Sequence, residues 1–281
     1  MGESPPVVLT IAGFDPSSGA GITADIKTIA AHGCYGVACI TAITVQSTSA
    51  VRRVEPLDPG LITEILEELQ ADFEIAAVHI GMLGSGGVAK AVADFLEKSS
   101  GQISNVVLDP VLKSSSGAAL LDGKGTKILI DKLIPLSDVV TPNVDEAAVL
   151  TGLEVQDMDG MKASALRLHE MGARAVVITG GHLDKAIDLL SIQVEKGEQN
   201  EVFRAERLQS NSTHGTGCAF STAIACHLAL NRGLAEATLL AKTYVSAAIA
   251  SAQPLGRGVG PVHHLYRREQ RRRAAGSGDE K

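Results

Sequence analysis

The run Thr-His-Gly-Thr-Gly-Cys at 213–218 has the composition of an anion-binding turn. Apolar residues then follow at the spacing of one helical face: Phe220, Ala223, Ile224 and Leu228. Glycines ahead of a helix let several N–H groups point the same way, and the helix start adds unpaired donors with about half a positive charge. This combination predicts a socket for a phosphate, or for a phosphoryl group in transfer, with Cys218 at its mouth. A glycine-rich helix start without function is the alternative.

Other polar and glycine-rich clusters follow short apolar runs along the chain. They lie at 13–21, 44–46, 81–84, 109–117, 141–146 and 179–182. If the apolar runs are parallel strands, their carboxyl ends share one edge of a sheet, where small molecules usually bind. We therefore expect these clusters to surround one site together with 213–218.

Strands and helices alternate along the sequence. Short apolar runs predict strands at 7–12, 37–45, 76–83, 105–108, 138–140 and 175–178, with 51–54 as a further short candidate. Helical spacing predicts a helix starting near Ile22 and helices at 58–72, 87–98, 126–134, 144–150, 158–171 and 234–252. Residues 187–194 and 201–208 alternate around 196–200, which predicts an exposed hairpin that covers the site or pairs with another subunit.

This alternation predicts an α/β fold with one domain over 1–265, in which helices cover both faces of a mostly parallel sheet. The hydrophobic content of 45% is enough for one large core. Aliphatic side chains must fill most of it, because the chain has no Trp, three Tyr and five Phe. Residues 267–281 are highly charged, so we expect a disordered tail over 266–281 rather than a nucleic-acid arm.

Composition also limits the partners. The net charge of −7 argues against nucleic acid or an anionic membrane. The first residues do not resemble a signal peptide, and no uninterrupted apolar run is long enough to span a bilayer. The cysteines lack C-x-x-C spacing and are expected to be buried thiols: Cys34, Cys39, Cys218 and Cys226. These features predict a cytoplasmic enzyme.

Four motifs occur in order between residues 7 and 262. They are Ile-Ala-Gly-Phe-Asp-Pro-Ser-Ser-Gly-Ala-Gly-Ile at 11–22 with Asp25 and Lys27, Gly-Met-Leu at 81–83, Thr-Pro-Asn at 141–143 with Glu146, and the run at 213–218. Together they resemble the hydroxymethylpyrimidine/phosphomethylpyrimidine kinases of thiamine biosynthesis, in the ribokinase-like superfamily. The resemblance implies a single-domain, Rossmann-type three-layer sandwich. It also implies a homodimeric, ATP- and Mg²⁺-dependent kinase that phosphorylates 4-amino-5-hydroxymethyl-2-methylpyrimidine and then its monophosphate.

The resemblance assigns five residues to the pyrimidine. Gln46 matches a residue that hydrogen-bonds the aminopyrimidine, which suits a carboxamide that donates and accepts; a loop-capping amide is the alternative. Gly13, Asp25 and Met82 match positions around the ring. Without the resemblance, Asp25 reads as a solvated helix carboxylate and Met82 as a core residue. Thr44 stands where related sequences often carry Val, and is a further candidate for contact with the substrate.

The resemblance places the nucleotide and the metal on the neighbouring strand ends. The expected nucleotide contacts are Asn143, Thr179, Gly181, Thr213, His214 and Thr216, with His214 as a contact without a catalytic role. Asp109 and Glu146 match the magnesium–phosphate region, and carboxylates suit a Mg²⁺ ion that keeps several waters. Asn143 and Glu146 also fit a helix capping box, and both interpretations can hold together.

Cys218 is expected to be catalytic, with the backbone of Gly215 and Gly217 holding the transferring group. Ribokinase-like sugar kinases carry Asp at this position, as the general base. A thiol at a helix N-terminus is expected to have a lowered pKa, which would make thiolate available near neutrality. One match is imperfect: Lys113 comes two residues early, and Ser115 occupies the lysine position of many relatives, so the role of Lys113 stays open.

Two rival functions remain. Pyridoxal kinases of the same superfamily share the cysteine-bearing loop and act on a ring with a hydroxymethyl group. A kinase-derived regulator that holds the pyrimidine without turnover is the second rival, and the intact Gly-Thr-Gly-Cys run argues against it.

Overall fold

The computed structural model describes residues 4–114, 116–181, 186–195, 197–206 and 208–268. Its centre is one nine-stranded sheet in the order β3-β2-β1-β4-β5-β6-β7-β8-β9. The strands are β1 (Val7–Phe14), β2 (Tyr35–Gln46), β3 (Val51–Pro56), β4 (Ile75–Ile80), β5 (Val106–Leu108), β6 (Val139–Val140), β7 (Ala175–Gly180), β8 (Ala186–Val194) and β9 (Gly197–Ala205). The pairs from β2 to β7 are parallel, whereas β3, β8 and β9 join antiparallel. The prediction of a mostly parallel α/β sheet is confirmed.

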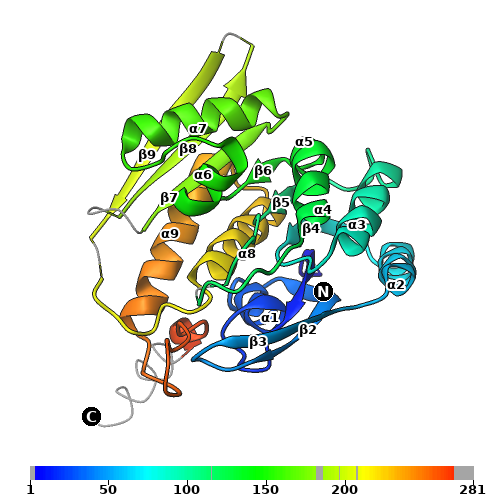
Figure 1. The fold of residues 1–281 in the computed structure, drawn as a ribbon, viewed down its shortest axis with the longest axis horizontal. Coiled ribbons are helices and arrows are strands. Elements are labelled where there is room, and N and C mark those ends of the chain that lie inside the picture. The colour runs from blue at the N-terminus through cyan, green and yellow to red at the C-terminus, as the bar shows by residue number, and fades with distance from the viewer. Residues whose placement is uncertain (1–3, 115, 182–185, 196, 207, 269–281) are drawn as a thin grey trace.

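Helices cover both faces of this sheet and produce three layers (Figure 1). They are α1 (Gly21–Ala31), α2 (Pro59–Asp72), α3 (Gly86–Lys98), α4 (Gly123–Ile128), α5 (Ile134–Leu136), α6 (Val144–Thr151), α7 (Met158–Glu170), α8 (Thr216–Ala229) and α9 (Leu234–Ala250). The strands are buried on both sides: in β1, Val8 belongs to the core under α1, α8 and α9, and Leu9 to the core under the other helices. Burial on both faces explains why these strands read as continuous apolar runs.

The helix expected at 126–134 is right in type and wrong in its bounds. It begins earlier, at Gly123, because the Asp122 carboxylate caps its start and accepts a 2.6 Å hydrogen bond from the Gly125 N–H. The chain then passes through a π-helical turn, Leu129–Leu133, into α5. The apolar pattern revealed the buried part of this helical stretch, but not its polar first turn.

The predicted hairpin is the β8–β9 pair. It extends the sheet beyond β7, with which β8 pairs from Gly180↔Ile187 to Ala175↔Ile192. Most of β9 is exposed, so pairing with another subunit stays a prediction. At the chain end, Tyr266 is buried at 6% exposure, so the folded part reaches past the expected boundary at 265. The rest of the predicted tail, 269–281, lies outside the described residues.

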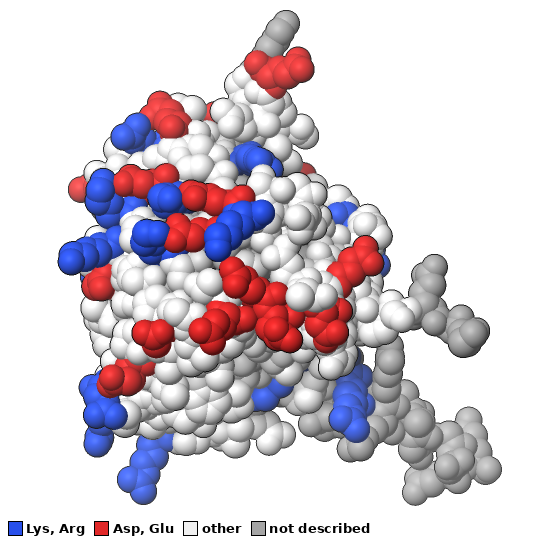
Figure 2. All heavy atoms as spheres, turned by 90° about the vertical axis from the view of Figure 1, so that its right-hand side faces the viewer, with Lys and Arg blue, Asp and Glu red and all other residues white. Residues whose placement is uncertain are grey.

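One side of the molecule carries many charged side chains. Figure 2 shows Lys and Arg interleaved with Asp and Glu in one region of this face, and acidic side chains gathered in another. Exposed ion pairs of this kind join α2, α3 and the segment after α4, such as Lys98–Glu67 at 3.2 Å and Lys132–Glu97 at 2.9 Å. Each contributes little to stability because water screens it. Among the residues that the structure places, none of the helices is both long and apolar enough to cross a membrane.

Candidate active site

Two glycine-rich loops meet at the carboxyl edge of the parallel strands. One follows β1 and contains Gly19, and the other leads into α8 and contains Gly215. The backbone of Gly215 has φ +81°, and a methyl group there would overlap the carbonyl oxygen of Gly19. A methyl group on Gly19 would in turn overlap the ring of His214. The approach therefore requires glycine at both positions, and it joins the first and last of the four motifs into one wall.

Asp15 ties these two loops together. Its carboxylate accepts hydrogen bonds from the N–H groups of Ser17 (2.8 Å), Gly19 (3.3 Å) and Ala20 (3.0 Å). The Nε2 atom of His214 lies 2.8 Å from Oδ2 of Asp15. Burial alone would raise the pKa of Asp15, but the hydrogen bonds from His214 and Ser17 lower it overall. Asp15 lies within the motif at 11–22 but was not among the predicted site residues.

Gln46 brings the predicted acceptor side into the same network. It is the last residue of β2, and its side-chain amide lies 3.3 Å from Nε2 of His214. The Thr44 hydroxyl lies 3.0 Å from the Phe14 carbonyl oxygen and 3.2 Å from Oε1 of Gln46. The ring of His214 therefore contacts Gln46, a residue predicted to bind the phosphoryl acceptor. Its predicted contact with the nucleotide stays a prediction.

Gly13 and Met82 face each other beside this network. A Cβ on Gly13 would lie 2.8 Å from Sδ of Met82, so this strand end has no space for a larger residue. Met82 forms a small apolar cluster with Ala42 and Leu120, separate from the two main cores. At 9% exposure Met82 is almost buried, which fits the core alternative and also an apolar wall beside a ring. Contact with the pyrimidine stays a prediction for both residues.

A late segment of the chain closes the wall next to Gln46. The N–H of Gly258 donates to the Thr48 hydroxyl at 3.1 Å, and the N–H of Val259 donates to the Thr48 carbonyl at 3.0 Å. The next residue, Gly260, accepts a 3.0 Å hydrogen bond from the N–H of His214. Residues 258–260 thus bridge the turn after β2 and the loop before α8.

Asp25 lies beneath the site and is not exposed at all. Its carboxylate accepts hydrogen bonds from the hydroxyls of Thr10 (2.7 Å) and Thr222 (3.0 Å). The Nδ1 atom of His79 is 3.5 Å from the same carboxylate. A solvated helix carboxylate is therefore the wrong description of Asp25. Its predicted role at the pyrimidine stays a prediction, because every contact described here is with the protein.

Asp109 and Glu146 form an acidic pair where β5 and β6 end. Burial raises the pKa of Asp109 to about 6, against the opposing effect of His79. Burial and the nearby Asp109 carboxylate raise the pKa of Glu146 to about 8. Burial is the main cause of both shifts, and a nearby carboxylate adds to each: Asp25 for Asp109, and Asp109 for Glu146. A divalent cation would supply the missing charge, so this pair fits the predicted metal site.

The capping box at the start of α6 is present. The N–H of Glu146 donates to Oδ1 of Asn143 at 2.9 Å, and the N–H of Asn143 donates to Oε2 of Glu146 at 3.0 Å. The N–H of Thr179 donates to the Pro142 carbonyl at 2.9 Å, which brings the end of β7 beside Asn143. Two predicted nucleotide residues, Asn143 and Thr179, are thus neighbours. Besides the cap, the Glu146 carboxylate also receives a backbone hydrogen bond from Leu112, so its structural role is shown and its metal-binding role stays a prediction.

Cys218 lies in the first turn of α8 and is partly exposed. The expectation of a lowered pKa is wrong. Burial of the thiol, together with the carboxylates of Asp109 and Asp25, raises the pKa well above its usual value, although the Gly21 N–H acts in the opposite direction. The helix start alone favoured a thiolate, whereas the surrounding strand ends supply negative charge that opposes it. Cys218 is therefore a neutral thiol at neutral pH in the metal-free protein.

The remaining predicted residues lie in the loop and first turn of α8 or directly after β7. Gly217 is next to Asp109, since a Cβ on Gly217 would lie 3.8 Å from Oδ2 of Asp109. Thr216 is the first residue of α8, and its hydroxyl donates to the carbonyl of Thr213 at 2.6 Å. Gly181 is exposed and directly follows β7. The nucleotide contacts of Thr213, Thr216 and Gly181 stay predictions, as does the backbone role of Gly215 and Gly217.

The shifted lysine gains no role from the structure. Lys113 is exposed and pairs with Ala119 through an isolated antiparallel bridge. Ser115, which occupies the usual lysine position, lies outside the described residues.

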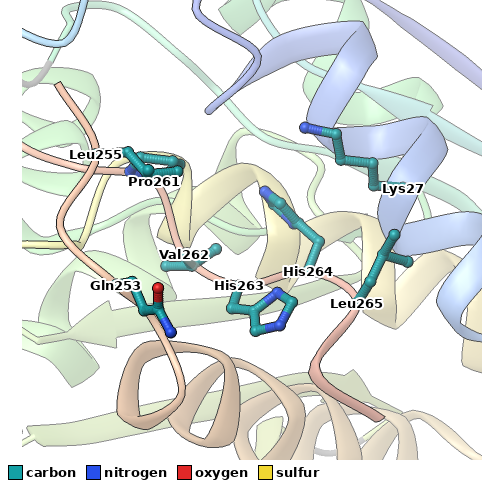
Figure 3. Close-up of a pocket in the computed structure, with 8 residues that line it drawn as sticks. All are labelled: Lys27, Gln253, Leu255, Pro261, Val262, His263, His264 and Leu265. Atoms are coloured by element: carbon teal, nitrogen blue, oxygen red, sulfur yellow. The ribbon is translucent and has the colours of Figure 1, made fainter. Parts of the chain in front are cut away.

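A cavity of about 320 Å³ lies elsewhere, between α1 and the C-terminal segment (Figure 3). Its lining combines the side chain of Lys27 with residues that follow α9: Gln253, Leu255, Pro261, Val262, His263, His264 and Leu265. None of the residues predicted for the site lines it. The candidate site is therefore defined by the convergence of strand ends and loops around Cys218, and not by this cavity.

Comparison with known proteins identifies the family. The family model for phosphomethylpyrimidine kinase matches residues 15–263. The chain belongs to this family. It is 40% identical over 260 residues to the hydroxymethylpyrimidine/phosphomethylpyrimidine kinase of Haemophilus influenzae, which covers 92% of this chain and 96% of that protein.

Two further comparisons extend this result. A thiamine biosynthesis bifunctional protein of Geobacter sulfurreducens is 41% identical over 264 residues, which is 93% of this chain but 53% of that longer protein. The ADP complex of Bacillus subtilis pyridoxal kinase superposes with a TM-score of 0.85 at 35% identity, covering 95% of this chain and all of that one. This phosphomethylpyrimidine kinase family member is thus a phosphotransferase with the ribokinase-like fold.

Besides Asp15, sequence reasoning missed His79 and Ser221. His79 lies in the apolar strand β4 and is completely buried, and its Nε2 is 2.9 Å from the Ser221 hydroxyl. Ser221 in turn lies 3.2 Å from Oδ2 of Asp109. The available signals were a histidine within an apolar strand and a serine close after Cys218 in its helix.

Proposed function

We propose that this kinase transfers the γ-phosphoryl group of ATP to the hydroxymethyl oxygen of 4-amino-5-hydroxymethyl-2-methylpyrimidine, and in a second turnover to the monophosphate product. The contact between Gln46 and His214 supports this proposal, because it joins the residue predicted for the acceptor to the loop that leads into α8, which is the predicted anion-binding turn. The ADP complex of the related pyridoxal kinase supports ATP as the phosphoryl donor. The names of the family relatives support the pyrimidine as acceptor.

In the first step, the acceptor oxygen forms a bond to the γ-phosphorus while the bond to the bridging oxygen breaks and ADP leaves with the electron pair. We expect the backbone N–H groups at the start of α8, from Gly215 to Cys218, to hold the charge on the transferring group, although that of Thr216 also donates to the Thr213 carbonyl at 3.2 Å. Phosphoryl transfer passes through a loose transition state, so the acceptor proton need not leave early. A neutral Cys218 thiol is compatible with this chemistry.

We propose that Asp109 and Glu146 hold Mg²⁺. Their raised pKa values show that they lack compensating positive charge. The described part of the chain contains no cluster of three or more acidic, histidine or cysteine ligands. Two carboxylates suit Mg²⁺, which retains several waters and is usually shared with substrate phosphates. When bound, the ion would neutralise charge on the nucleotide phosphates.

A neutral thiol in place of a carboxylate also suits a two-step kinase. The second acceptor carries a phosphate, and a permanent carboxylate at position 218 would repel it. Cys218 without a charge avoids this repulsion while still filling the position. The proposal therefore links the identity of residue 218 to the use of two successive acceptors.

The pyridoxal kinase alternative is favoured by one observation, the structural similarity to the Bacillus subtilis enzyme. Single-turnover assays with the pyrimidine alcohol and pyridoxal in competition separate the two functions. We expect the pyrimidine to be phosphorylated in preference, and then its monophosphate. Preference for pyridoxal would refute the proposed acceptor, and failure to release ADP with either alcohol would support the non-catalytic regulator.

We also propose a cytoplasmic homodimer. The four cysteines are free thiols, which is the usual state in a reducing compartment. Ile43 and Val45 of β2 are about half exposed, at 48% and 47%, beside the edge strand β3. An exposed apolar strip next to an edge strand is a common place for a second copy to pack. Light scattering of the purified protein tests the dimer.

A further inference from the structure

A series of buried polar side chains lies beneath the candidate site and connects Asp25 with Asp109. It runs from Asp25 through His79 and Ser221 to Asp109, across α1, β4, α8 and the end of β5. Asp25, His79 and Ser221 have no exposed surface, and Asp109 is 5% exposed. Polar groups at this depth are costly unless all of their hydrogen bonds are made, so the positions of the hydrogens can be deduced.

On one side of His79, every neighbour is an acceptor. The single hydroxyl hydrogen of Thr10 is used at 2.7 Å from Oδ2 of Asp25. Nδ1 of His79 lies 3.3 Å from the Thr10 oxygen and 3.5 Å from that same carboxylate oxygen. Since neither atom can donate to it, Nδ1 must carry a hydrogen.

On the other side of His79, Ser221 has one hydrogen and several acceptors. Its oxygen lies 3.2 Å from Oδ2 of Asp109, and also 3.1 Å and 3.2 Å from the carbonyls of Gly217 and Cys218. Nε2 of His79 lies 2.9 Å away. If Nε2 had no hydrogen, Ser221 would have to donate to it. The Asp109 carboxylate would then lose its hydrogen bond from Ser221, the one side-chain donor that it has among the described residues. A hydrogen on Nε2 leaves the serine hydrogen available for Asp109.

We propose that His79, with a hydrogen on both ring nitrogens, is a positioning residue that makes Ser221 a donor to Asp109 and so fixes this carboxylate for the metal. Charge supports the assignment, because an imidazolium lies between two buried carboxylates that have no other buried cation beside them in the residues that the structure covers. The Asp25 carboxylate raises the pKa of His79 even though burial alone would lower it. The inference rests on the proposed function of Asp109.

Variants at position 79 separate positioning from simple packing. His79→Gln keeps an N–H near the place of Nε2 and can still donate to Ser221, whereas His79→Asn keeps only a group near Nδ1. Mn²⁺ binding, followed by electron paramagnetic resonance with ADP present, is the readout. We expect His79→Asn and Ser221→Ala to weaken Mn²⁺ binding about tenfold, as for other residues that orient metal ligands, and His79→Gln to weaken it no more than about threefold. Equal effects of Asn and Gln, or no effect of Ser221→Ala, would overturn the proposal.

A matched control exists in α7. His169 is also buried, with Nε2 at 2.9 Å from the Ser191 hydroxyl and Nδ1 at 2.7 Å from the Ala173 carbonyl, but it has no contact with the site. His169→Asn should leave Mn²⁺ binding unchanged within twofold. If it weakens binding as much as His79→Asn, the effect is general destabilisation and the proposal fails.

Nuclear magnetic resonance of the histidine ring nitrogens tests the hydrogens directly in the metal-free, wild-type protein. We expect both nitrogens of His79 to carry a hydrogen at neutral pH, and a nitrogen without one would refute the assignment. Asp109→Asn distinguishes this inference from the proposed function. Unchanged Mn²⁺ binding in Asp109→Asn would refute the metal site itself, whereas loss in Asp109→Asn without loss in His79→Asn or Ser221→Ala refutes the inference alone.

Discussion

The two ends of α8 each carry a cysteine, Cys218 and Cys226, in different electrostatic surroundings. At the N-terminal end, Cys218 and Ser221 lie beside buried carboxylates whose pKa values are raised because the space lacks positive charge. At the C-terminal end, Cys34 donates to the carbonyl of Cys226 at 4.0 Å, and the charges that act on His227 are those of Arg232 and Arg267. The same helix thus has carboxylates near one end and arginines near the other.

At the C-terminal end of α8, the ring of His227 packs against another ring but its nitrogens make no hydrogen bonds with the described residues. It lies edge-on to the ring of His32, with centroids 4.9 Å apart. Burial lowers the pKa of both histidines to about 4, so both are neutral. The unpaired ring nitrogens of His227 thus lie at the end of α8 that packs against the ring of His32, whereas the buried carboxylates lie at the end with the candidate site.

The largest effect is expected at the N-terminal end, from Asp109→Asn. Loss of one carboxylate from the proposed metal pair should lower kcat/KM by about 100- to 1000-fold, the range seen when a group that stabilises transition-state charge is removed. Stability should change little, because a buried and poorly compensated charge is lost as well. Steady-state kinetics with thermal denaturation tests this, and an active variant would contradict the assigned charge imbalance.

Gly215→Ala should follow, with a loss of about 100-fold in activity. The added methyl group overlaps the Gly19 carbonyl, and an alanine at this position has to adopt φ +81°. The two loops must therefore separate, which displaces the start of α8. Displacements of about 1 Å can cost this much in rate. The control is Gly233→Ala at the start of α9, where φ is −65° and a Cβ meets nothing within 4 Å. Similar losses in both variants would argue against a specific contact.

Cys218→Asp sharpens the comparison by adding a carboxylate to the charged end. We expect the rate of the second phosphorylation to fall about tenfold more than that of the first, because the added charge repels the monophosphate acceptor. Separate assays with the alcohol and with the monophosphate measure the two steps. Equal losses would show that the charge of residue 218 does not discriminate between the acceptors.

The smallest effect is expected at the C-terminal end, where acid should reduce stability. The folded-state pKa values of His32 and His264 are about 4, below the usual value of 6.5. Between these two values the unfolded chain takes up protons as the pH falls and the folded protein does not, so stability is lost. Each should cost about 1 kcal/mol of unfolding free energy at pH 5.5. His227 acts in the same direction, and His227→Phe should make the loss shallower. Urea unfolding at pH 7.5 and 5.5 measures this, and an unchanged difference would contradict it.

Most of the fold was predictable because strands buried on both faces and helices with an apolar face leave clear patterns. The bounds of polar turns were not, as at Gly123, where an Asp122 cap extends the helix beyond its apolar part. The sequence also predicted that the polar clusters follow strands, and the structure brings several of them together at one edge of the sheet. The prediction of a lowered pKa for Cys218 was wrong because burial raises the pKa, together with carboxylates from α1, from the residue after β5 and from α6, whereas the local sequence shows only the helix start. The contact of His79 with Ser221 spans 142 positions and has no local signal.

The bridge from Gly258 and Val259 to Thr48 has a consequence for how the enzyme is made. The first strands leave the ribosome long before the segment that closes the wall beside Gln46. A growing chain can therefore form most of the sheet before the wall of the candidate site beside Gln46 is complete. The wall beside Gln46 can therefore be complete only after residues 258–260 have been translated.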